Sequence, residues 1–302
     1  MTPENQRWLL LGAGGQLGAE WARYLKTHGY AYKACTRKEV DITRPDEVRG
    51  VIAKFRPDIV INAAAYTAVD QAEEDAVTAG KVNSVAAGNL ARLCADHGTL
   101  LVHYSTDYVF AGKLEDRAAY PEGYPEAAEP HPVNRYGETK WMGEKAIQQE
   151  RCPHLIVRVS WLCGHYGNNF IHTMLRLARE KKQINVVNDQ HGCPTFTRPA
   201  VLNTMALIEA EQRGTWHISS AGETTWYDFA KAVFEKHRSR GNGTDRNHGP
   251  VSVIPIPTSE YPTKAARPEW SRLCIKRLAE VKGSRILPWQ EELAEFMRDL
   301  PD

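Results

Sequence analysis

Residues Leu9–Gly18, "LLLGAGGQLG", give the clearest indication of the fold of this chain. It joins a short apolar run, expected to be a buried strand, to three glycines spaced three residues apart, Gly12, Gly15 and Gly18. Small residues in such a turn let backbone amides approach a pyrophosphate that lies on the N-terminus of the following helix. The same spacing is also typical of any tight turn, but its place between the first strand and its helix favours dinucleotide binding.

Strand-like and helix-like segments alternate beyond this turn, which is typical of a parallel sheet covered by helices. Strands are expected at residues 7–11, 30–35, 58–64, 99–105 and 154–161, and another at 214–220 that rejoins the sheet. Helices are expected at residues 16–28, 46–55, 79–97 and 170–182, and another that begins near residue 134. We therefore predict an α/β fold, a Rossmann-like doubly wound parallel sheet with a smaller C-terminal α/β substrate domain.

The predicted domains are not continuous in the chain. The dinucleotide-binding domain is expected to span residues 1–165 and to be rejoined by about 195–220. The substrate domain is expected to take residues 166–194 and 221–302.

Composition excludes several classes of protein. The 302 residues carry 38 Lys and Arg against 37 Asp and Glu, so no global field favours nucleic acid or a membrane surface. No apolar run approaches the roughly 20 residues of a membrane helix, and the N-terminus lacks the layout of a signal peptide. The six cysteines are scattered without a C-x-x-C pair, which indicates reduced thiols. We expect a cytoplasmic enzyme or binding protein without a metal.

The end of the second strand bears on the choice of cofactor. An acidic residue there would bind the ribose 2′-hydroxyl of NAD, whereas an arginine suits the 2′-phosphate of NADP. Arg37 and Lys38 stand at this position, so NADPH is favoured, although both side chains also suit a solvated surface. Asp41 and Ile42, slightly further on, are expected to wall the adenine.

Tyr136 and Lys140 lie four residues apart where a proline-rich loop turns into a helix. Hydride transfer to a ketone leaves an alkoxide that must be protonated as it forms. An ammonium one helical turn away favours a phenolate, so we expect Lys140 to lower the pKa of Tyr136. Such a pair alone is common on surface helices, but downstream of the glycine turn it indicates a reductase.

Ser105 and Thr106 end the fourth expected strand, where ligands of parallel sheets bind. Either hydroxyl would orient a carbonyl opposite Tyr136. Asp107 follows and would accept substrate hydroxyls or assist protonation. The same three residues also suit a turn that ends a strand and caps a helix.

Together these residues resemble the extended short-chain dehydrogenases/reductases and, among them, the dTDP-4-dehydrorhamnose reductase family. The resemblance covers nearly the whole chain, and its more specific motifs are "NAAAYTAVDQAE" (62–73), "STDYVFAG" (105–112), "RVSWLCG" (158–164) and "NDQHGCPT" (188–195). It implies reduction of the C4 ketone of dTDP-4-dehydro-6-deoxy-L-mannose to dTDP-L-rhamnose. NADPH is the implied cofactor, with NADH as an alternative.

The resemblance extends the residues inferred above to a full set of site residues. The cofactor contacts are Gly12, Gly15, Gln16, Leu17, Arg37, Asp41, Ile42, Ala63, Ala64, Ala65, Tyr66, Thr67, Tyr104, Tyr136 and Lys140. The catalytic residues are Tyr136 as proton donor, Lys140, Thr106 and Asp107. The substrate contacts are Thr67, Val69, Thr106, Asp107, Trp161, Asn168 and Arg267. The flat face of Trp161 would pack against the sugar or nucleotide.

Two other functions stay open at this point. One is reduction of another nucleotide 4-keto-6-deoxy sugar, UDP-linked or acetamido-substituted. The other is a non-catalytic, NADP-binding regulatory subunit that resembles the methionine adenosyltransferase beta subunit. Some relatives pair their subunits through a metal held just after the G-x-P-T turn, but residues 192–200 here, "GCPTFTRPA", contain no carboxylate. We therefore expect a monomer or a weak homodimer.

Overall fold

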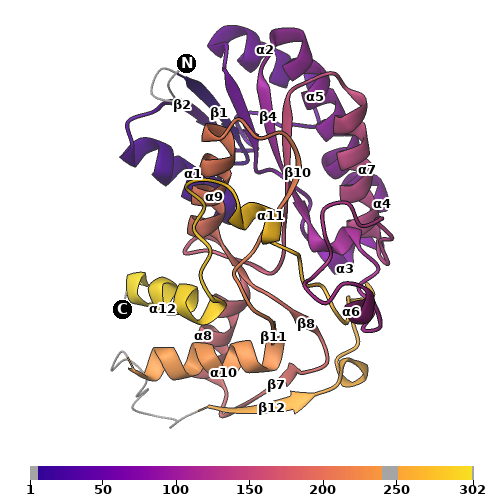
Figure 1. Ribbon diagram of the computed structural model, residues 1–302, viewed down its shortest axis with the longest axis vertical. Helices are drawn as coiled ribbons and strands as arrows, with labels where there is room; N and C mark the ends of the chain where they lie inside the picture. The colour runs from indigo at the N-terminus through magenta and orange to yellow at the C-terminus, as the bar shows by residue number, and fades with distance from the viewer. Residues whose placement is uncertain (1–5, 240–250, 301–302) are drawn as a thin grey trace.

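The computed structural model describes residues 6–239 and 251–300. Its main sheet has six strands in the order β10-β5-β4-β3-β1-β2, and every pairing is parallel (Figure 1). The strands are β1 (Arg7–Leu11), β2 (Ala31–Cys35), β3 (Ile59–Asn62), β4 (Leu100–Thr106), β5 (His154–Val159) and β10 (Gly214–Ile218). The predicted Rossmann-like parallel sheet is confirmed.

Helices cover both faces of this sheet. One face carries α1 (Gln16–Thr27), α9 (Thr197–Glu209) and α11 (Lys276–Ala279), and the other carries α2 (Pro45–Phe55), α5 (Ala86–His97) and α7 (Arg135–Gln149). Trp8 and Leu10 of β1 pack in the core on the α1 side, whereas Leu9 and Leu11 pack in the core on the α2 side. The strand is therefore apolar throughout, as in a parallel sheet buried on both faces.

The chain reverses direction across the sheet at β1, which lies between β2 and β3. Ligands of such sheets bind in the crevice at this switch point, beyond the carboxyl ends of the strands. Gly12 turns here with φ +81°, and a Cβ on it would lie 2.5 Å from the backbone nitrogen of Ala64. A Cβ on Gly18 would lie 2.1 Å from the carbonyl oxygen of Gly12. These two glycines are required by close packing around the crevice.

The helix expected at residues 79–97 is not continuous. The structure has α4 (Ala76–Gly80), a π turn η2 (Lys81–Val85) and then α5. Within the π turn, the Asn83 side chain accepts a hydrogen bond from Tyr66 N at 2.9 Å and donates one to Tyr66 O at 3.1 Å. The turn thereby presents Asn83 to the loop that follows β3.

A second group of elements has its own core. It contains α8 (Phe170–Glu180), α10 (Trp226–His237) and α12 (Trp289–Asp299), with β7 (Gln183–Val187) paired in parallel to β12 (Ser252–Ile256). Four short strands form two further pairs. These are β6 (Leu162–Cys163) with β9 (Thr195–Phe196), and β8 (His191–Gly192) with β11 (Thr224–Thr225). The remaining short elements are α3 (Val69–Ala72), η3 (Asp107–Val109), α6 (Asp116–Ala119) and η5 (Thr258–Glu260).

Segments far apart in sequence alternate between the two cores. The chain leaves the sheet after β5 and returns through α9 and β10, in the region expected for this return. The segment around α11 differs from the expected assignment, because Leu278 packs in the core of the main sheet and Arg277 lies over the ring of Trp216 at 3.6 Å. The full domain division stays a prediction.

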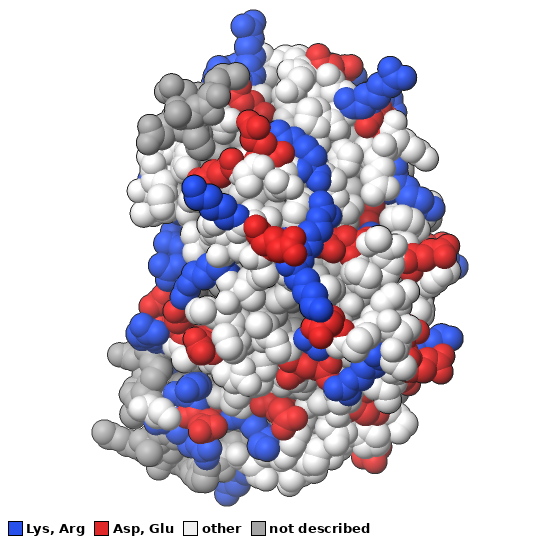
Figure 2. All heavy atoms as spheres, in the orientation of Figure 1, with Lys and Arg blue, Asp and Glu red and all other residues white. Residues whose placement is uncertain are grey.

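Charges of both signs are interspersed over the face shown in Figure 2. Among the described residues, no helix combines the length and the apolar composition that crossing a membrane requires.

Candidate active site

Two hollows adjoin each other at the carboxyl ends of the central strands. The first has a volume of about 250 Å³ and lies against the glycine turn and the ends of β2 and β3. The second has a volume of about 520 Å³ and extends past β4 and α7 toward residues 161–168. Both are lined by Gly14, Gly15, Ala63 and Ala65, so together they form one cleft.

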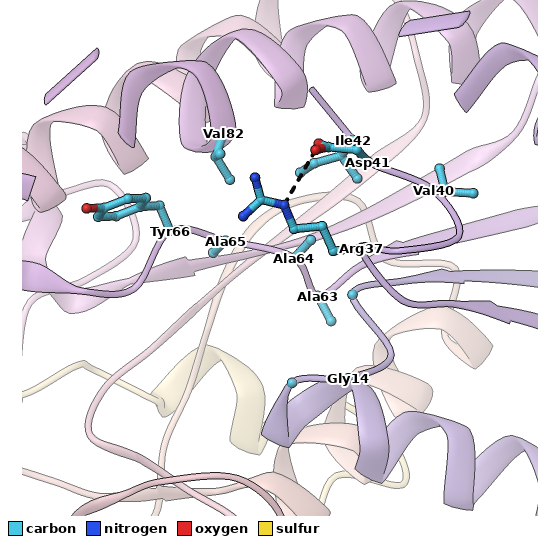
Figure 3. Close-up of a pocket in the computed structure, with 12 residues that line it drawn as sticks. Gly14, Arg37, Val40, Asp41, Ile42, Ala63, Ala64, Ala65, Tyr66 and Val82 are labelled. Carbon is cyan, nitrogen blue, oxygen red and sulfur yellow. Dashed lines mark hydrogen bonds and ion pairs between the residues drawn. The ribbon is translucent and has the colours of Figure 1, made fainter. Parts of the chain in front are cut away.

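The first hollow contains most of the expected cofactor contacts, which are Gly12, Gly15, Arg37, Asp41, Ile42, Ala63, Ala64, Ala65 and Tyr66 (Figure 3). The Arg37 side chain, 79% exposed, reaches across it and donates from Nε to Asp41 Oδ2 at 3.4 Å. Burial raises the pKa of Asp41, but hydrogen bonds from Thr43 and the charge of Arg37 outweigh this and hold the pKa below its ordinary value. An exposed cation with a long, single ion pair is free to meet a bound anion.

The start of α1 suits a pyrophosphate. Gly15 caps the helix without a side-chain hydrogen bond, and no acidic residue lies in the first turn. The first backbone N–H groups of the helix therefore remain available for an anion. Gln16 donates to Leu162 O at 3.3 Å, while its Oε1 is buried with no hydrogen-bond partner among the described residues. These features fit a dinucleotide, and Gln16 and Leu17 also line the second hollow.

The second hollow brings together the four expected catalytic residues, Thr106, Asp107, Tyr136 and Lys140. Thr106 ends β4, Asp107 begins η3, and the other two lie in the first turns of α7. Asn134 caps α7 by accepting a hydrogen bond from Gly137 N at 2.8 Å.

Close packing seats α7 against η3. A Cβ on Gly137 would lie 2.1 Å from Tyr108 O, so a larger residue would displace the helix. The rings of Tyr108 and Tyr136 meet edge to face at 5.5 Å. Two elements that are separate in the sequence, η3 and α7, thus meet at one end of the cleft.

The Tyr136 phenol does not have the lowered pKa that its spacing from Lys140 predicted. Burial raises its pKa to about 12, and hydrogen bonding with Thr106 offsets only part of this effect. The prediction is wrong for this structure because Lys140 Nζ donates to Tyr104 O at 2.6 Å and contacts His103 Nε2 at 3.3 Å. Burial also lowers the pKa of Lys140 to about 8. Tyr136 therefore keeps its proton at neutral pH, as a proton donor must.

Asp107 is the third ionisable group of this cluster. Burial raises its pKa to about 6, against the opposing effect of hydrogen bonds with Ser271 and Thr106. Thr106 Oγ1 donates to Asp107 Oδ1 at 2.9 Å and accepts from Tyr108 N at 3.2 Å. Ser105 also lines the cleft, and its hydroxyl is buried without a hydrogen-bond partner among the described residues.

The expected substrate contacts are placed unequally. Thr67, Val69, Trp161 and Asn168 line the second hollow with Thr106 and Asp107. Trp161 adopts φ +46° and stacks on Trp226 at 3.6 Å and 11°. One face of its indole is therefore covered, and only the other face or an edge is left for a ligand.

Two expected contacts have side-chain polar groups that bind other residues, although Tyr104 itself lines the second hollow. Arg267 is not part of the cleft wall, because its guanidinium binds Asp70 Oδ2 at 2.8 Å and Ala265 O at 3.0 Å. The Tyr104 hydroxyl accepts from Trp21 Nε1 at 2.8 Å and pairs with Thr204 Oγ1 at 2.9 Å. Tyr104 contributes its backbone carbonyl, which receives the hydrogen bond from Lys140.

Several residues of the cleft were not expected. They are Gly14, Val40 and Val82 in the first hollow, and Tyr108, Val159, Leu162 and Gly167 in the second. Tyr108 directly follows the Ser-Thr-Asp sequence, so its position in the sequence could have predicted that it lines the cleft. No sequence pattern predicts Val82 at the cleft, because only the π turn places it there. Within residues 6–239 and 251–300, no three His, Cys, Asp or Glu side chains are grouped to hold a metal ion.

A parallel sheet with a glycine turn at its switch point, and a tyrosine and lysine from α7 in the adjoining cleft, define a Rossmann protein of the short-chain dehydrogenase/reductase class. Comparison with known proteins is more specific. The chain belongs to the family of the RmlD substrate binding domain, whose model matches residues 6–301.

Named relatives cover nearly the whole chain. The chain is 38% identical over 304 residues to a dTDP-4-dehydrorhamnose reductase of Burkholderia thailandensis, covering 97% of this chain and 98% of that protein. It is 36% identical over 293 residues to a dTDP-4-keto-6-deoxy-D-glucose reductase of Streptomyces niveus, covering 96% of each. A crystal structure of dTDP-4-dehydrorhamnose reductase from Bacillus anthracis in complex with NADP superimposes with a TM-score of 0.88 at 37% identity, covering 97% of this chain and 99% of that one. The family predicted from the motifs is confirmed.

Proposed function

We propose that this protein reduces the C4 ketone of dTDP-4-dehydro-6-deoxy-L-mannose with NADPH to give dTDP-L-rhamnose. The observation that carries the proposal is the convergence of Thr106, Tyr136 and Lys140 in a cleft that adjoins the glycine turn. The names of the relatives from Burkholderia thailandensis and Bacillus anthracis support the substrate, and the NADP complex of the latter supports the cofactor.

Each catalytic residue has one task in this proposal. NADPH, when bound, supplies the hydride. The Tyr136 phenol, kept protonated by burial, donates its proton to the oxygen at C4 as negative charge develops there. Thr106 turns its one hydroxyl hydrogen from Asp107 to the same oxygen and thereby orients it. The Lys140 ammonium stabilises the phenolate that remains. Asp107 accepts a hydroxyl of the sugar.

The cofactor would lie along the first hollow and enter the second. Gly12, Gly15, Gln16 and Leu17 would hold the pyrophosphate at the start of α1. Arg37 would bind the 2′-phosphate, with Asp41 and Ile42 against the adenosine. The loop from Ala63 to Thr67 would lie along the nicotinamide side. In the second hollow, Val69, Trp161 and Asn168 would contact the nucleotide sugar.

A second candidate is reduction of a different nucleotide 4-keto sugar, with another base, an acetamido group or another configuration. The relative from Streptomyces niveus supports this candidate. It is named as a reductase of a D-gluco sugar, and it is nearly as similar to this chain as the relative from Burkholderia thailandensis. NADH as an alternative cofactor, a cytoplasmic location and a monomer or weak homodimer stay predictions.

The test is coupled oxidation of NADPH with a panel of nucleotide keto-sugars, followed by NMR of the product. The panel pairs the dTDP-linked L-sugar with its UDP-linked, acetamido and D-gluco counterparts. We expect the highest kcat/KM for the dTDP-linked L-sugar and a product with the rhamno configuration. Preference for another sugar would select the second candidate. Cofactor binding without turnover on any sugar would instead favour a regulatory subunit.

A further inference from the structure

A row of buried polar side chains runs from the end of β3 to Lys140. Asn62 Nδ2 lies 3.0 Å from His103 Nδ1, and His103 Nε2 lies 3.3 Å from Lys140 Nζ. Each of the three side chains is only 1% exposed. Their hydrogen bonds must therefore be satisfied by one another and by the backbone. The catalytic scheme above uses Lys140 but gives no role to Asn62 or His103.

The backbone fixes which way the Asn62 amide points. Ala64 N donates to Asn62 Oδ1 at 3.2 Å, which places the amide oxygen on that side. The Nδ2 group carries only donors, so it donates to His103 Nδ1. Nδ1 must then be the unprotonated nitrogen, and the neutral ring carries its hydrogen on Nε2. That hydrogen faces Lys140.

The tautomer of His103 discriminates between the two forms of Lys140. Lys140 already donates one hydrogen to Tyr104 O at 2.6 Å. An uncharged amine has a lone pair that accepts the hydrogen from Nε2, whereas an ammonium has none and would face it with another hydrogen. Burial acts in the same direction, since it lowers the pKa of Lys140 to about 8 and that of His103 well below its ordinary value.

Other ionisable groups near Lys140 lie outside this row. On α7, Tyr136 is one turn before it and Glu144 one turn after it. The charge of Glu144 favours the ammonium, but Glu144 Oε2 is bound by Arg158 Nη2 of β5 at 2.7 Å. Asp107 of η3 lines the same cleft. From β4, His103 is the ionisable side chain in direct contact with Lys140.

We propose that Asn62 and His103 are positioning residues that lock one histidine tautomer, whose Nε2 hydrogen eases the loss of a proton from the Lys140 ammonium in the free protein. The ammonium remains the form that serves in turnover. The role of this tautomer lock in turnover rests on the function proposed above. Its existence does not, because the tautomer and the titration of Lys140 can be measured without a substrate.

The first test is the tautomer itself, measured by NMR on protein labelled with ¹⁵N-histidine. We expect His103 to carry its hydrogen on Nε2. The NMR signal of His103 is assigned by its absence from the spectrum of His103→Gln. His217 serves as an internal comparison. Its Nε2 lies 3.4 Å from Arg158 Nη1, which can only donate, so His217 should carry its hydrogen on Nδ1. A hydrogen on Nδ1 of His103 would overturn the proposal.

The second test reverses the lock. In Asn62→Asp, the carboxylate accepts from both Ala64 N and the ring, so the hydrogen moves to Nδ1 and Nε2 accepts from the Lys140 ammonium. We expect the Lys140 titration, followed by NMR of ¹³Cε-labelled lysine, to move up by about one pH unit or more. The exposed Asn185→Asp makes the same charge change and should leave it unmoved.

Equal titration of Lys140 in both aspartate variants would contradict the lock. If Asn62→Asp does not fold, the tautomer of the wild-type protein still decides the proposal. Failure of the proposed function would look different, because the NMR results would stand while every sugar of the panel went unreduced.

Discussion

Burial favours the uncharged form of three ionisable side chains in the second hollow. It raises the pKa of Tyr136 to about 12 and that of Asp107 to about 6, and it lowers that of Lys140 to about 8. Desolvation disfavours the charged form of each group. The cleft therefore keeps the phenol protonated, and the lysine can change its charge near physiological pH.

Replacing Tyr136 with Phe removes the hydroxyl that we propose as proton donor and leaves the ring in place. We expect turnover to fall by about 10²–10⁴-fold, the usual value of general acid catalysis, with NADPH binding unchanged. Steady-state kinetics and a fluorescence titration with NADPH measure the two quantities. Tyr120→Phe, at a tyrosine outside the cleft lining, is the control. A Tyr136→Phe protein that kept more than about a tenth of the wild-type kcat would rule out this role.

Arg37→Ala tests the reading of the 2′-phosphate. A charge-assisted hydrogen bond is worth about 1.5–3 kcal/mol, so NADPH affinity should fall by about tenfold or more while NADH affinity changes little. Lys38→Ala removes the neighbouring charge, which is also exposed but does not line the cleft, and should alter neither affinity strongly. Equal losses for both cofactors in Arg37→Ala would show that Arg37 does not read the phosphate.

At the scale of elements, two turns place the cleft. The glycine turn brings the start of α1 against the end of β3, because Gly12 packs onto Ala64. The π turn η2 then fixes the loop after β3, since Asn83 binds both backbone groups of Tyr66 and also donates to Thr139 Oγ1 of α7 at 3.1 Å. The loop after β3 and helix α7 are thereby joined through one buried side chain.

Gly18→Ala and Gly50→Ala form a matched pair on two helices. A Cβ on Gly18 would lie 2.1 Å from Gly12 O, so the backbone must shift, and we expect a loss of about 1–3 kcal/mol in the free energy of unfolding. Gly50 in α2 has nothing within 4 Å of an added Cβ, so its replacement should gain about 0.5–1 kcal/mol. Urea unfolding measures both changes. A stabilising effect of Gly18→Ala would contradict the packing of the turn.

At the scale of the whole molecule, α12 ties the C-terminal group of elements to the end of the main sheet. Its first turn carries Glu292, which is buried and accepts a hydrogen bond from Ser220, just after β10. Arg198, at the start of α9, forms an ion pair at 2.8 Å with Asp299, the last residue of α12. Burial raises the pKa of Glu292 to about 7, with Ser220 and Arg285 opposing it.

This raised pKa makes part of the stability depend on pH. Between the ordinary value of 4.5 and about 7, the folded protein holds the Glu292 proton and the unfolded chain does not. The free energy of unfolding should therefore fall as pH rises through this window. Glu292→Gln stays uncharged and should reduce the fall between about pH 5 and pH 8 by about 2 kcal/mol in urea unfolding. Glu291→Gln, exposed on the same turn, should keep the wild-type dependence. Parallel curves for all three proteins would show that Glu292 does not titrate in this range.

Local sequence patterns were enough to predict the Rossmann-like sheet, the glycine turn after β1 and the pair of Tyr136 and Lys140. These features rest on local patterns, namely apolar runs, glycine spacing and residues one helical turn apart, which act within a few residues of each other. The family followed from motifs of the same kind.

The environment of those residues depends instead on how distant segments of the chain pack together. The raised pKa of Tyr136, the stacking of Trp161 on Trp226 and the pairing of Arg267 with Asp70 all depend on contacts between distant segments. The row from Asn62 to Lys140 likewise joins β3, β4 and α7. Such contacts arise when strands and helices pack, and burial then sets the charge of each group. The spacing of residues along the chain therefore predicts neither these contacts nor the charge of the buried groups.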